Sequence, residues 1–327
     1  MEDRLCDLGE KEILKRIERF VAPGLMNDDT AEISNYNKKL LINNDLLVEG
    51  VHFSKATMSA KDIGWKAVTS NLSDLAASGV EEIIGITVGL VAPGNTQWKW
   101  VEEVYTGLDE ALSKFGGQLL GGDCSSGSQK VLSITALGTL SNLRLHQANA
   151  LPGDFIVVSG AHGLSRLGLA LLQKDSLVSK NVLSESLQAK AILSHQKPTP
   201  PLEALKALIE CKPKNLPWRA ACTDSSDGLV EAISNLSKHS QCQAVINSSS
   251  IPRNKDWPKG SPWDDWCLNG GEDFELVLSL PKDWAEAFIS NFKSSYLIGY
   301  MQEGNPKIIF QNSKDLKINS RSYFNHF

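Results

Sequence analysis

The sequence predicts a protein of two domains, each of mixed α and β structure. With 327 residues the chain exceeds what one hydrophobic core usually serves, so two domains of roughly 150 residues each are expected. Helical and strand patterns alternate along the chain, which is typical of α/β and α+β architectures. The turn Leu151-Pro152-Gly153-Asp154 marks a boundary between the two halves. We therefore expect domains over residues 1–150 and 151–327.

The first half begins with a helix and continues with alternating elements. Ile13 and Ile17 share one helix face, and Pro23-Gly24 ends that helix. Ser59 and Asp62 have the spacing of a capping box, which opens the next helix. The elements expected here are helices over 10–20, 59–79 and 97–115, and strands over 39–48, 82–90, 118–120 and 131–140.

The second half keeps this alternation. A Pro-rich linker at 198–201 separates a polar helical stretch, which ends at His195, from the next helix. A strand over 219–223 leads directly into Asp224-Ser225-Ser226-Asp227-Gly228, so these polar residues lie between a strand and a helix. The other elements expected are strands over 155–159 and 274–280, and helices over 164–173, up to 210, and over 229–239.

Composition and charge exclude several classes of protein. Apolar residues make up 42% and charged residues 22%, and no run approaches the roughly 20 apolar residues that span a bilayer. A net charge of -5 without a Lys/Arg stripe argues against nucleic-acid binding. The N-terminus lacks a secretory signal pattern, so the cytoplasm is the expected location. Six cysteines without a Cys-x-x-Cys pair indicate free, mostly buried thiols.

Five short acidic signatures are spread along the chain, each with carboxylates beside glycine or small polar residues. Mg²⁺ prefers oxygen ligands and usually bridges one or two carboxylates to substrate phosphates. The ordered set therefore indicates a magnesium and nucleotide site built from separate loops. The signatures are Asn27-Asp28-Asp29-Thr30-Ala31, Asn71-Leu72-Ser73-Asp74-Leu75-Ala76-Ala77, Gly121-Gly122-Asp123, Asp224-Ser225-Ser226-Asp227-Gly228-Leu229 and Gly270-Gly271-Glu272-Asp273-Phe274-Glu275-Leu276.

Each signature also has a purely structural interpretation. An aspartate in a turn is more often a helix cap or a turn former than a metal ligand. Gly121-Gly122 and Gly270-Gly271 would let the backbone approach a ligand, but tight turns explain them equally well. Ser226 would either cap the following helix or contact a nucleotide. Asp45 is a stronger candidate, because a carboxylate inside an apolar strand needs a partner or a metal ion.

Several common catalytic motifs are absent from the sequence. It has no Walker A motif, kinase Gly-rich loop or Gly-x-Gly-x-x-Gly fingerprint, so nucleotide binding would use another architecture. The missing His-Glu-x-x-His and Gly-x-Ser-x-Gly patterns argue against a zinc hydrolase and an esterase. His52 follows Asp45 closely and would reach a substrate there, although a structural histidine is the more usual role.

In their order and spacing the signatures resemble the thiamine-monophosphate kinase family of the aminoimidazole-ribonucleotide-synthetase-like superfamily of ATP-using enzymes. Members of that family carry Gly-Asp-Asp near the N-terminus and a polar-polar-Asp followed by Gly-x-His-Phe. They also carry Asn-Leu-Ser-Asp-Leu-Ala-Ala, Gly-Gly-Asp, Asp-x-Ser-Asp-Gly-Leu and Gly-Gly-Glu-Asp-Tyr/Phe-Glu-Leu. This chain has nearly all of these motifs, spread over almost its full length.

The resemblance implies roles for individual residues. Thiamine monophosphate would contact His52, Glu272 and, in the C-terminal Phe324-Asn325-His326-Phe327, the ring of Phe324. ATP would lie beside Gly122, Asp123 and Ser226. The implied magnesium ligands are Asp29, Asn43, Asn44, Asp45, Asp74, Asp123, Asp224 and Asp227.

This chain departs from the family pattern at a few positions. Asn27 replaces the usual glycine, and Asn43-Asn44 stand where the family has Ser or Thr, so amide or backbone oxygens would meet the metal ions there. Gln147 lies where family members usually have an arginine that meets the nucleotide. Weaker ATP affinity is the expected consequence.

The implied reaction is direct, in-line transfer of the γ-phosphate of ATP to thiamine monophosphate, which gives thiamine diphosphate without a phosphoenzyme. The implied fold has an N-terminal α/β domain that holds ATP at a homodimer interface, and a C-terminal α+β domain. Two alternatives stay open: another ATP-using member of the superfamily, or a non-catalytic protein that binds metal or nucleotide. Among those relatives, selenophosphate synthetase is disfavoured because Cys6 lacks the expected glycine-rich setting.

Overall fold

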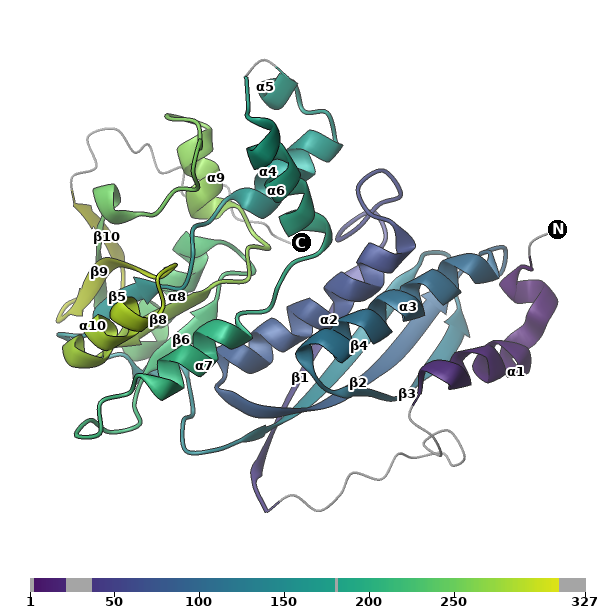
Figure 1. Cartoon of the computed structure of the whole chain (residues 1–327), viewed down its shortest axis with the longest axis horizontal. Coiled ribbons are helices and arrows are strands. Elements are labelled where there is room, and N and C mark those ends of the chain that lie inside the picture. The colour runs from purple at the N-terminus through teal and green to yellow at the C-terminus, as the bar shows by residue number, and fades with distance from the viewer. Residues whose placement is uncertain (1–2, 22–36, 180–181, 312–327) are drawn as a thin grey trace. The chain divides into compact units, whose positions relative to one another are not determined.

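The structure, a computed structural model, describes residues 3–21, 37–179 and 182–311 (Figure 1). The chain forms two compact units. The first comprises Met1–Leu75 and Val80–Ser141, and the second comprises Ala76–Gly79 and Asn142–Phe327. The domain ranges 1–150 and 151–327, and the roles given to them, stay predictions.

The first unit contains three α-helices, a 3-10 helix and four strands among its described residues. In chain order they are α1 (Leu5–Ile17), η1 (Glu18–Phe20), β1 (Lys39–Val48), α2 (Ala60–Ala77), β2 (Val80–Ala92), α3 (Trp98–Phe115), β3 (Gln118–Ser126) and β4 (Val131–Leu140). The capping box is confirmed at the start of α2, where Asp62 N donates to Ser59 Oγ and Ser59 N donates to Asp62 Oδ2, both at 3.2 Å.

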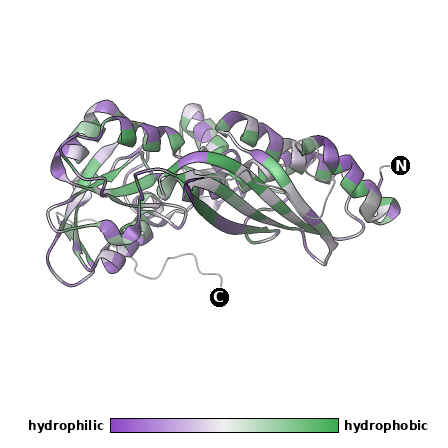
Figure 2. Cartoon of the chain, turned by 90° about the horizontal axis from the view of Figure 1, so that it is seen from below, coloured by the Kyte–Doolittle hydropathy of each residue, from purple (hydrophilic) through white to green (hydrophobic). Residues whose placement is uncertain are grey.

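The four strands form one sheet in the order β1-β4-β2-β3. β1 and β4 pair antiparallel, as do β4 and β2, whereas β2 and β3 are parallel. Helices α2 and α3 lie on one face of this sheet (Figure 1). Hydrophobic and hydrophilic residues alternate along its strands, seen as changes of colour in Figure 2. Side chains that point towards the helices are buried, including Ile86, Val88, Leu132 and Ile134.

The second unit is larger and has a sheet of six strands. Its elements are η2 (Gln147–Asn149), β5 (Phe155–Val158), α4 (Leu164–Leu172), α5 (Ser176–Ser179), α6 (Glu185–Gln196), α7 (Leu202–Glu210), β6 (Ala221–Asp224), α8 (Leu229–Ser240), β7 (Gln243–Asn247), η3 (Ser248–Ser250), α9 (Trp263–Asn269), β8 (Leu276–Leu280), α10 (Lys282–Asn291), β9 (Tyr296–Gln302) and β10 (Ile308–Gln311). The strand order is β10-β7-β9-β5-β8-β6, and only β10 and β7 pair in parallel.

Two hydrophobic cores stabilise the second unit. In one, α8 packs on the sheet, with Ile233 and Leu236 against Ile156 and Val158. The other lies among the helices α4, α6 and α9, where Leu167 and Trp266 are buried. This helical core positions the start of α4 close to the loop that precedes β8.

The predicted elements agree with the structure in most places, but some boundaries were wrong. The helix expected over 10–20 begins earlier, at Leu5, and ends at Ile17, where η1 follows. The strand expected over 118–120 continues to Ser126, because parallel pairing with β2 extends it through Gly121, Gly122 and Asp123. Some elements were not predicted from the sequence, namely η2, β7, η3, α9, α10, β9 and β10. All six cysteines are free, and three of them are buried. No helix within the described ranges has the length and apolar character needed to cross a membrane.

Candidate functional site

Asn43, on β1, is joined to α2 through its side-chain amide. Its Nδ2 donates to Asn71 Oδ1 at 3.0 Å and to Asp74 Oδ2 at 2.9 Å. Asn71 and Asp74 therefore share one face of α2, as their spacing predicted. Asn43 Oδ1 is buried and has no hydrogen-bond partner among the residues that the structure describes. Asn43 thus presents a buried acceptor oxygen beside the carboxylate of Asp74.

The alternation of side chains along β1 divides its three polar candidates between two faces. Asn43 and Asp45 lie on the face covered by α2 and α3, and Asp45 pairs with the buried Ile134. Asn44 lies on the opposite face, where its Nδ2 donates to Ser133 Oγ at 3.2 Å. Asn44 would meet a metal ion on the covered face only through its main chain, which is one of the two routes expected for it.

Gly121, Gly122 and Asp123 lie within β3, so the glycines do not form a tight turn. A Cβ at Gly122 would lie 2.0 Å from Val88 O, so strand packing alone requires glycine there. A Cβ at Gly121 would meet no atom within 4 Å. The main chain at Gly121 therefore has open space beside it on the sheet face that α2 and α3 do not cover. Asp123 is exposed on that same face, and its Oδ1 accepts a hydrogen bond from Cys124 N at 2.8 Å.

His52 lies in the turn that follows β1. Its Nδ1 accepts a hydrogen bond from Val48 N at 3.0 Å, so the neutral ring carries its proton on Nε2. The carbonyl oxygen of His52 accepts from Lys66 Nζ at 3.5 Å, and Lys66 is buried on α2. The turn is therefore attached to both neighbouring elements, and the ring is oriented as a hydrogen-bond donor.

The donors of the first unit fit magnesium in their chemistry. Carboxylate and amide oxygens are the hard ligands that Mg²⁺ prefers, and the unpartnered Asn43 Oδ1 is one of them. Over residues 3–21, 37–179 and 182–311, no three His, Cys, Asp or Glu side chains come together as a group that could hold a metal ion. Asp29 lies outside the described residues, and Asp224 and Asp227 belong to the second unit. The ligand set taken from the sequence therefore stays a prediction.

In the second unit, the signature at Asp224 forms the connection between β6 and α8. Asp224 ends β6, and Ser226 Oγ donates to Asp224 Oδ1 at 2.9 Å. The N-cap of α8 is Gly228, without a side-chain capping bond, so the alternative that Ser226 caps this helix is wrong. Asp227 is exposed in the same connection.

Main-chain hydrogen bonds join this connection to the loop before β8. Glu272 N donates to Ser226 O at 2.7 Å, and Ser225 N donates to Glu275 O at 3.0 Å. Glu275 N donates in return to Ser225 Oγ at 3.0 Å. A Cβ at Gly271 would lie 2.5 Å from Ser226 O, so the two loops pack closely. These contacts therefore hold Ser226, a predicted ATP contact, close to Glu272, a predicted contact of thiamine monophosphate.

Glu272 and Asp273 have different partners at the start of α4. Glu272 has a φ of 64°, in the left-handed region, and its Oε2 lies 3.4 Å from His195 Nδ1. Asp273 Oδ2 accepts from Gly163 N at 2.6 Å and Oδ1 accepts from Ser165 N at 3.1 Å, so Asp273 caps α4. Desolvation by the surrounding protein raises the pKa of Asp273 to about 7, although these two hydrogen bonds oppose the shift.

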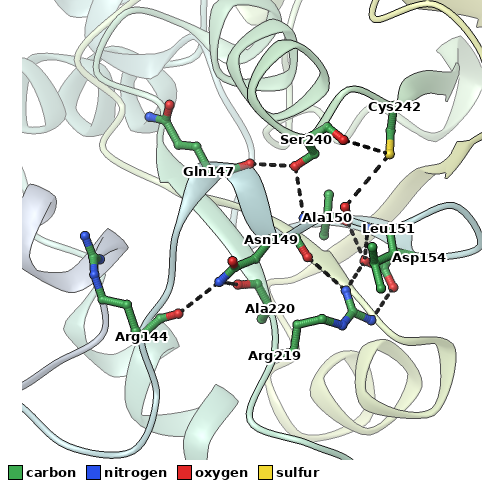
Figure 3. A network of polar contacts seen from close by, with 11 residues as sticks. Arg144, Gln147, Asn149, Ala150, Leu151, Asp154, Arg219, Ala220, Ser240 and Cys242 are labelled. Carbon is green, nitrogen blue, oxygen red and sulfur yellow. Dashed lines mark hydrogen bonds and ion pairs between the residues drawn. The ribbon is translucent and has the colours of Figure 1, made fainter.

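Gln147 is attached to the second unit by its side chain and its main chain. Its Nε2 donates to Thr223 Oγ1 at 3.0 Å, next to Asp224. Its carbonyl oxygen accepts from Ser240 Oγ at 2.8 Å, and Figure 3 shows the side chain extending away from Ser240. Gln147 is thus bound beside Asp224, one of the predicted magnesium ligands.

Phe324, like Asp29, lies outside the described residues. Three residues near Glu272 were missed by sequence reasoning: Ser165, His195 and Asp273. Asp273 belongs to the acidic signature Gly270–Leu276, but its position alone did not predict a role, and His195 was predicted only to end a polar helical stretch. No sequence spacing connects Ser165 and His195 with Glu272, because they come from α4, α6 and a loop before β8.

Comparison with known proteins gives matches over the whole chain. Residues 27–140 match the family model of the AIR synthase related protein, N-terminal domain, and residues 152–311 match the corresponding C-terminal domain. The chain is 53% identical over 326 residues to thiamine-monophosphate kinase of Prochlorococcus marinus, covering 100% of this chain and 98% of that protein. It is 38% identical to the enzyme of the same name from Synechococcus elongatus, covering 93% and 92%.

A solved structure is also similar over nearly the full length. It is that of AaThiL complexed with AMPPCP and TMP, with a TM-score of 0.74, 28% sequence identity and coverage of 99% of both chains. The similarity includes both units of the fold, each matched by its own family model.

Proposed function

This chain belongs to the AIR synthase-related family and to the thiamine-monophosphate kinases within it, and we propose that it transfers the γ-phosphate of ATP to thiamine monophosphate. The products are thiamine diphosphate and ADP, which makes this the last step of thiamine diphosphate biosynthesis. The observation that carries the proposal is the 53% identity, over the whole chain, to the kinase of Prochlorococcus marinus. The AaThiL structure adds support, since AMPPCP and TMP occupy a protein of the same fold.

For the nucleotide, the proposed contacts are Gly122, Asp123 and Ser226. The open space at Gly121 supports an approach of the ligand to the backbone of β3, because a Cβ at this position would meet no atom within 4 Å. Ser226 supports it differently, because its hydroxyl donates to Asp224 Oδ1 and is not used to cap helix α8.

For thiamine monophosphate, the proposed contacts are His52, Glu272 and Phe324. The hydrogen bond at Nδ1 leaves His52 with Nε2 as the protonated nitrogen, which suits a phosphate oxygen. Glu272 supplies a carboxylate, the group that complements the positive charge of a thiazolium ring. The role of Phe324 follows from the family resemblance of the C-terminal residues.

The proposed magnesium ligands supply oxygen donors only, which suits this ion. Bound magnesium would neutralise negative charge on the phosphates. In the first unit the support comes from Asn43, whose buried Oδ1 lacks a partner among the described residues, and from the neighbouring Asp74. The full proposed set is Asp29, Asn43, Asn44, Asp45, Asp74, Asp123, Asp224 and Asp227.

The proposed chemistry is a direct displacement. A phosphate oxygen of thiamine monophosphate bonds to the γ-phosphorus while the bond from that phosphorus to the departing ADP oxygen breaks. The attacking oxygen is already ionised at neutral pH, so the protein needs to position the two phosphates rather than remove a proton. Inversion at a chiral γ-phosphate is the expected stereochemical result, and retention would indicate a phosphoenzyme instead.

The proposed assembly is a cytoplasmic homodimer formed through the first unit. Leu40, Ile42 and Leu46 alternate along the outer face of β1 and have 51%, 70% and 52% of their surface exposed. A row of large apolar side chains on one sheet face is typical of a protein interface. We expect I42E to lower the apparent mass in sedimentation to that of a monomer, and an unchanged mass would contradict this interface.

The decisive experiment is an assay with ATP, magnesium and thiamine monophosphate that follows thiamine diphosphate by its fluorescent oxidation product. Product should form with thiamine monophosphate and not with unphosphorylated thiamine. Binding of ATP by a folded protein without any turnover would instead favour a sister enzyme of the superfamily or a non-catalytic binding protein. Omission of magnesium in the same assay tests the metal requirement separately.

A further inference from the structure

Three side chains from separate segments of the second unit meet at one point. His195 Nδ1, on α6, lies 3.3 Å from Ser165 Oγ on α4 and 3.4 Å from Glu272 Oε2. Ser165 Oγ donates to the same Oε2 at 3.5 Å. His195 and Ser165 are buried, whereas 30% of the Glu272 side chain is exposed. A carboxylate that a ligand can reach is therefore contacted from the interior by two buried polar groups.

Close packing of α4 on α6 makes this meeting possible. A Cβ at Gly168 would lie 2.1 Å from Ala191 O and 2.9 Å from His195 Cβ. Gly168 follows Ser165 by one helical turn, so both lie on the face of α4 that contacts α6. The missing side chain at Gly168 lets α6 approach until His195 reaches Ser165.

The two ring nitrogens of His195 have different surroundings. An ionised carboxylate only accepts hydrogen bonds, so the tautomer of His195 with its proton on Nδ1 is the one that would donate to Glu272 Oε2, 3.4 Å away. His195 Nε2 is buried and has no hydrogen-bond partner within the described parts of the chain. Leaving a buried ring nitrogen unpaired is unfavourable, so packing alone does not account for histidine at this position.

The backbone on either side of the Glu272 side chain is already fixed. Glu272 N donates to Ser226 O at 2.7 Å, and the next residue, Asp273, caps α4 through Gly163 N and Ser165 N. The remaining freedom of Glu272 is in its own side-chain torsions. The contacts of His195 and Ser165 with Oε2 favour one of these side-chain conformations.

We infer that His195, together with Ser165, positions the Glu272 carboxylate for contact with thiamine monophosphate. The inference rests on the proposed function, in which Glu272 meets that substrate. His195 is a positioning residue here, since it acts through Glu272. Its effect should therefore appear in the affinity for thiamine monophosphate and be absent from the affinity for ATP.

Two substitutions at one position provide a matched test. In His195→Asn the side-chain amide nitrogen takes the place of Nδ1, whereas in His195→Gln it takes the place of Nε2. We expect H195Q to weaken thiamine monophosphate binding roughly tenfold, the effect of losing one hydrogen bond to a charged group, and H195N to stay close to the native affinity. Calorimetry with a non-hydrolysable ATP analogue present gives the affinity, and steady-state kinetics gives kcat and both KM values.

A double-mutant cycle with Glu272 shows whether the effect passes through that carboxylate. E272A should weaken thiamine monophosphate binding, and H195Q should add little in the E272A background. Additive losses would overturn the inference, and so would equal affinities of H195N and H195Q. Urea midpoints of both His195 variants identify any loss of stability that the two share.

Failure of the inference can be distinguished from failure of the proposed function. If the native protein makes no thiamine diphosphate, the proposed function fails. If it does, and E272A binds thiamine monophosphate normally, the role given to Glu272 and the inference built on it fail while the kinase activity stands.

Discussion

Arg219 donates two hydrogen bonds to the carboxylate of Asp154, from Nη1 at 2.6 Å and from Nη2 at 2.8 Å (Figure 3). Only 4% of the Asp154 side chain is exposed. The same Nη1 donates to Asn149 O at 3.0 Å, and Asp154 Oδ2 also accepts from Leu151 N at 2.9 Å. This ion pair therefore fixes the segment that leads into β5, which also carries Gln147.

We expect Asp154→Ala to lower the free energy of unfolding by about 3 kcal/mol, because it leaves the Arg219 guanidinium without its buried partner. Urea denaturation measures the loss. Glu210→Ala, which removes the exposed pair with Lys206 at 3.9 Å, is the control and should cost less than about 1 kcal/mol. Similar losses for the two variants would contradict a structural role for the Asp154 pair.

Gln147→Arg should strengthen ATP binding. The substitution introduces the residue type that the family resemblance leads us to expect there, and it places a guanidinium where Gln147 now bonds to Thr223. An Arg-phosphate contact is stronger than a neutral one, so a fall of roughly tenfold in the KM for ATP is expected, with the KM for thiamine monophosphate unchanged. Gln147→Ala separates the gain of arginine from the loss of the Thr223 bond. An unchanged or higher KM for ATP in Q147R would argue against this placement of the nucleotide.

Asp74→Asn should abolish turnover while the fold persists. The hydrogen bond from Asn43 Nδ2 can still be accepted by the new amide oxygen, so the contact between β1 and α2 survives. The negative charge is lost, and with it the proposed contact to magnesium, so kcat should fall by orders of magnitude. Circular dichroism and urea denaturation test the fold. A large loss of stability with substantial residual activity would identify Asp74 as a structural residue.

Asp273 should make the stability of the native protein depend on pH. Its pKa is raised from 3.8 to about 7, mainly by desolvation, and Glu275 and Glu272 add to the shift. The protonated form is therefore favoured in the folded state, and this contribution is fully present below pH 3.8 and is lost as the pH rises through about 7.

The comparison that isolates this effect uses Asp273→Asn, which does not titrate. Between those two pH values the unfolding free energy of the native protein should fall relative to D273N, by up to about 1.4 kcal/mol per pH unit. Urea unfolding of both proteins over a pH series measures the difference. Parallel pH profiles would show that Asp273 is ionised in the folded protein throughout.

Neighbouring glycines of β3 should respond differently to alanine. In Gly122→Ala the new Cβ would lie 2.0 Å from Val88 O, so we expect a loss of about 1–3 kcal/mol in unfolding free energy. In Gly121→Ala the Cβ meets no atom within 4 Å, so the stability should stay close to native. If ATP approaches the strand there, G121A nevertheless raises the KM for ATP. A KM for ATP in G121A equal to that of the native protein would show that ATP does not approach β3 at Gly121.

Local features of the sequence predicted much of the fold. The capping box of Ser59 and Asp62 was found where expected, and Asn71 and Asp74 share a helix face because 3.6 residues complete a turn. In contrast, β3 was expected to end too early. Its extension through Gly121 and Gly122 comes from pairing with β2, a contact between segments that no local pattern describes.

By itself, the sequence determined the order of most elements and the acidic signatures, because each of these depends on residues close together in the chain. It also indicated the family, because the order and spacing of those signatures can be read along the chain without a structure. Tertiary structure decided which face of β1 the helices α2 and α3 cover, the partner of Ser226, and the meeting of Ser165, His195 and Glu272. Ser165 is separated by 30 residues from His195 and by 107 from Glu272. Only the packing of α4 on α6, together with the hydrogen bonds between the two loops, brings such distant side chains within reach of one another.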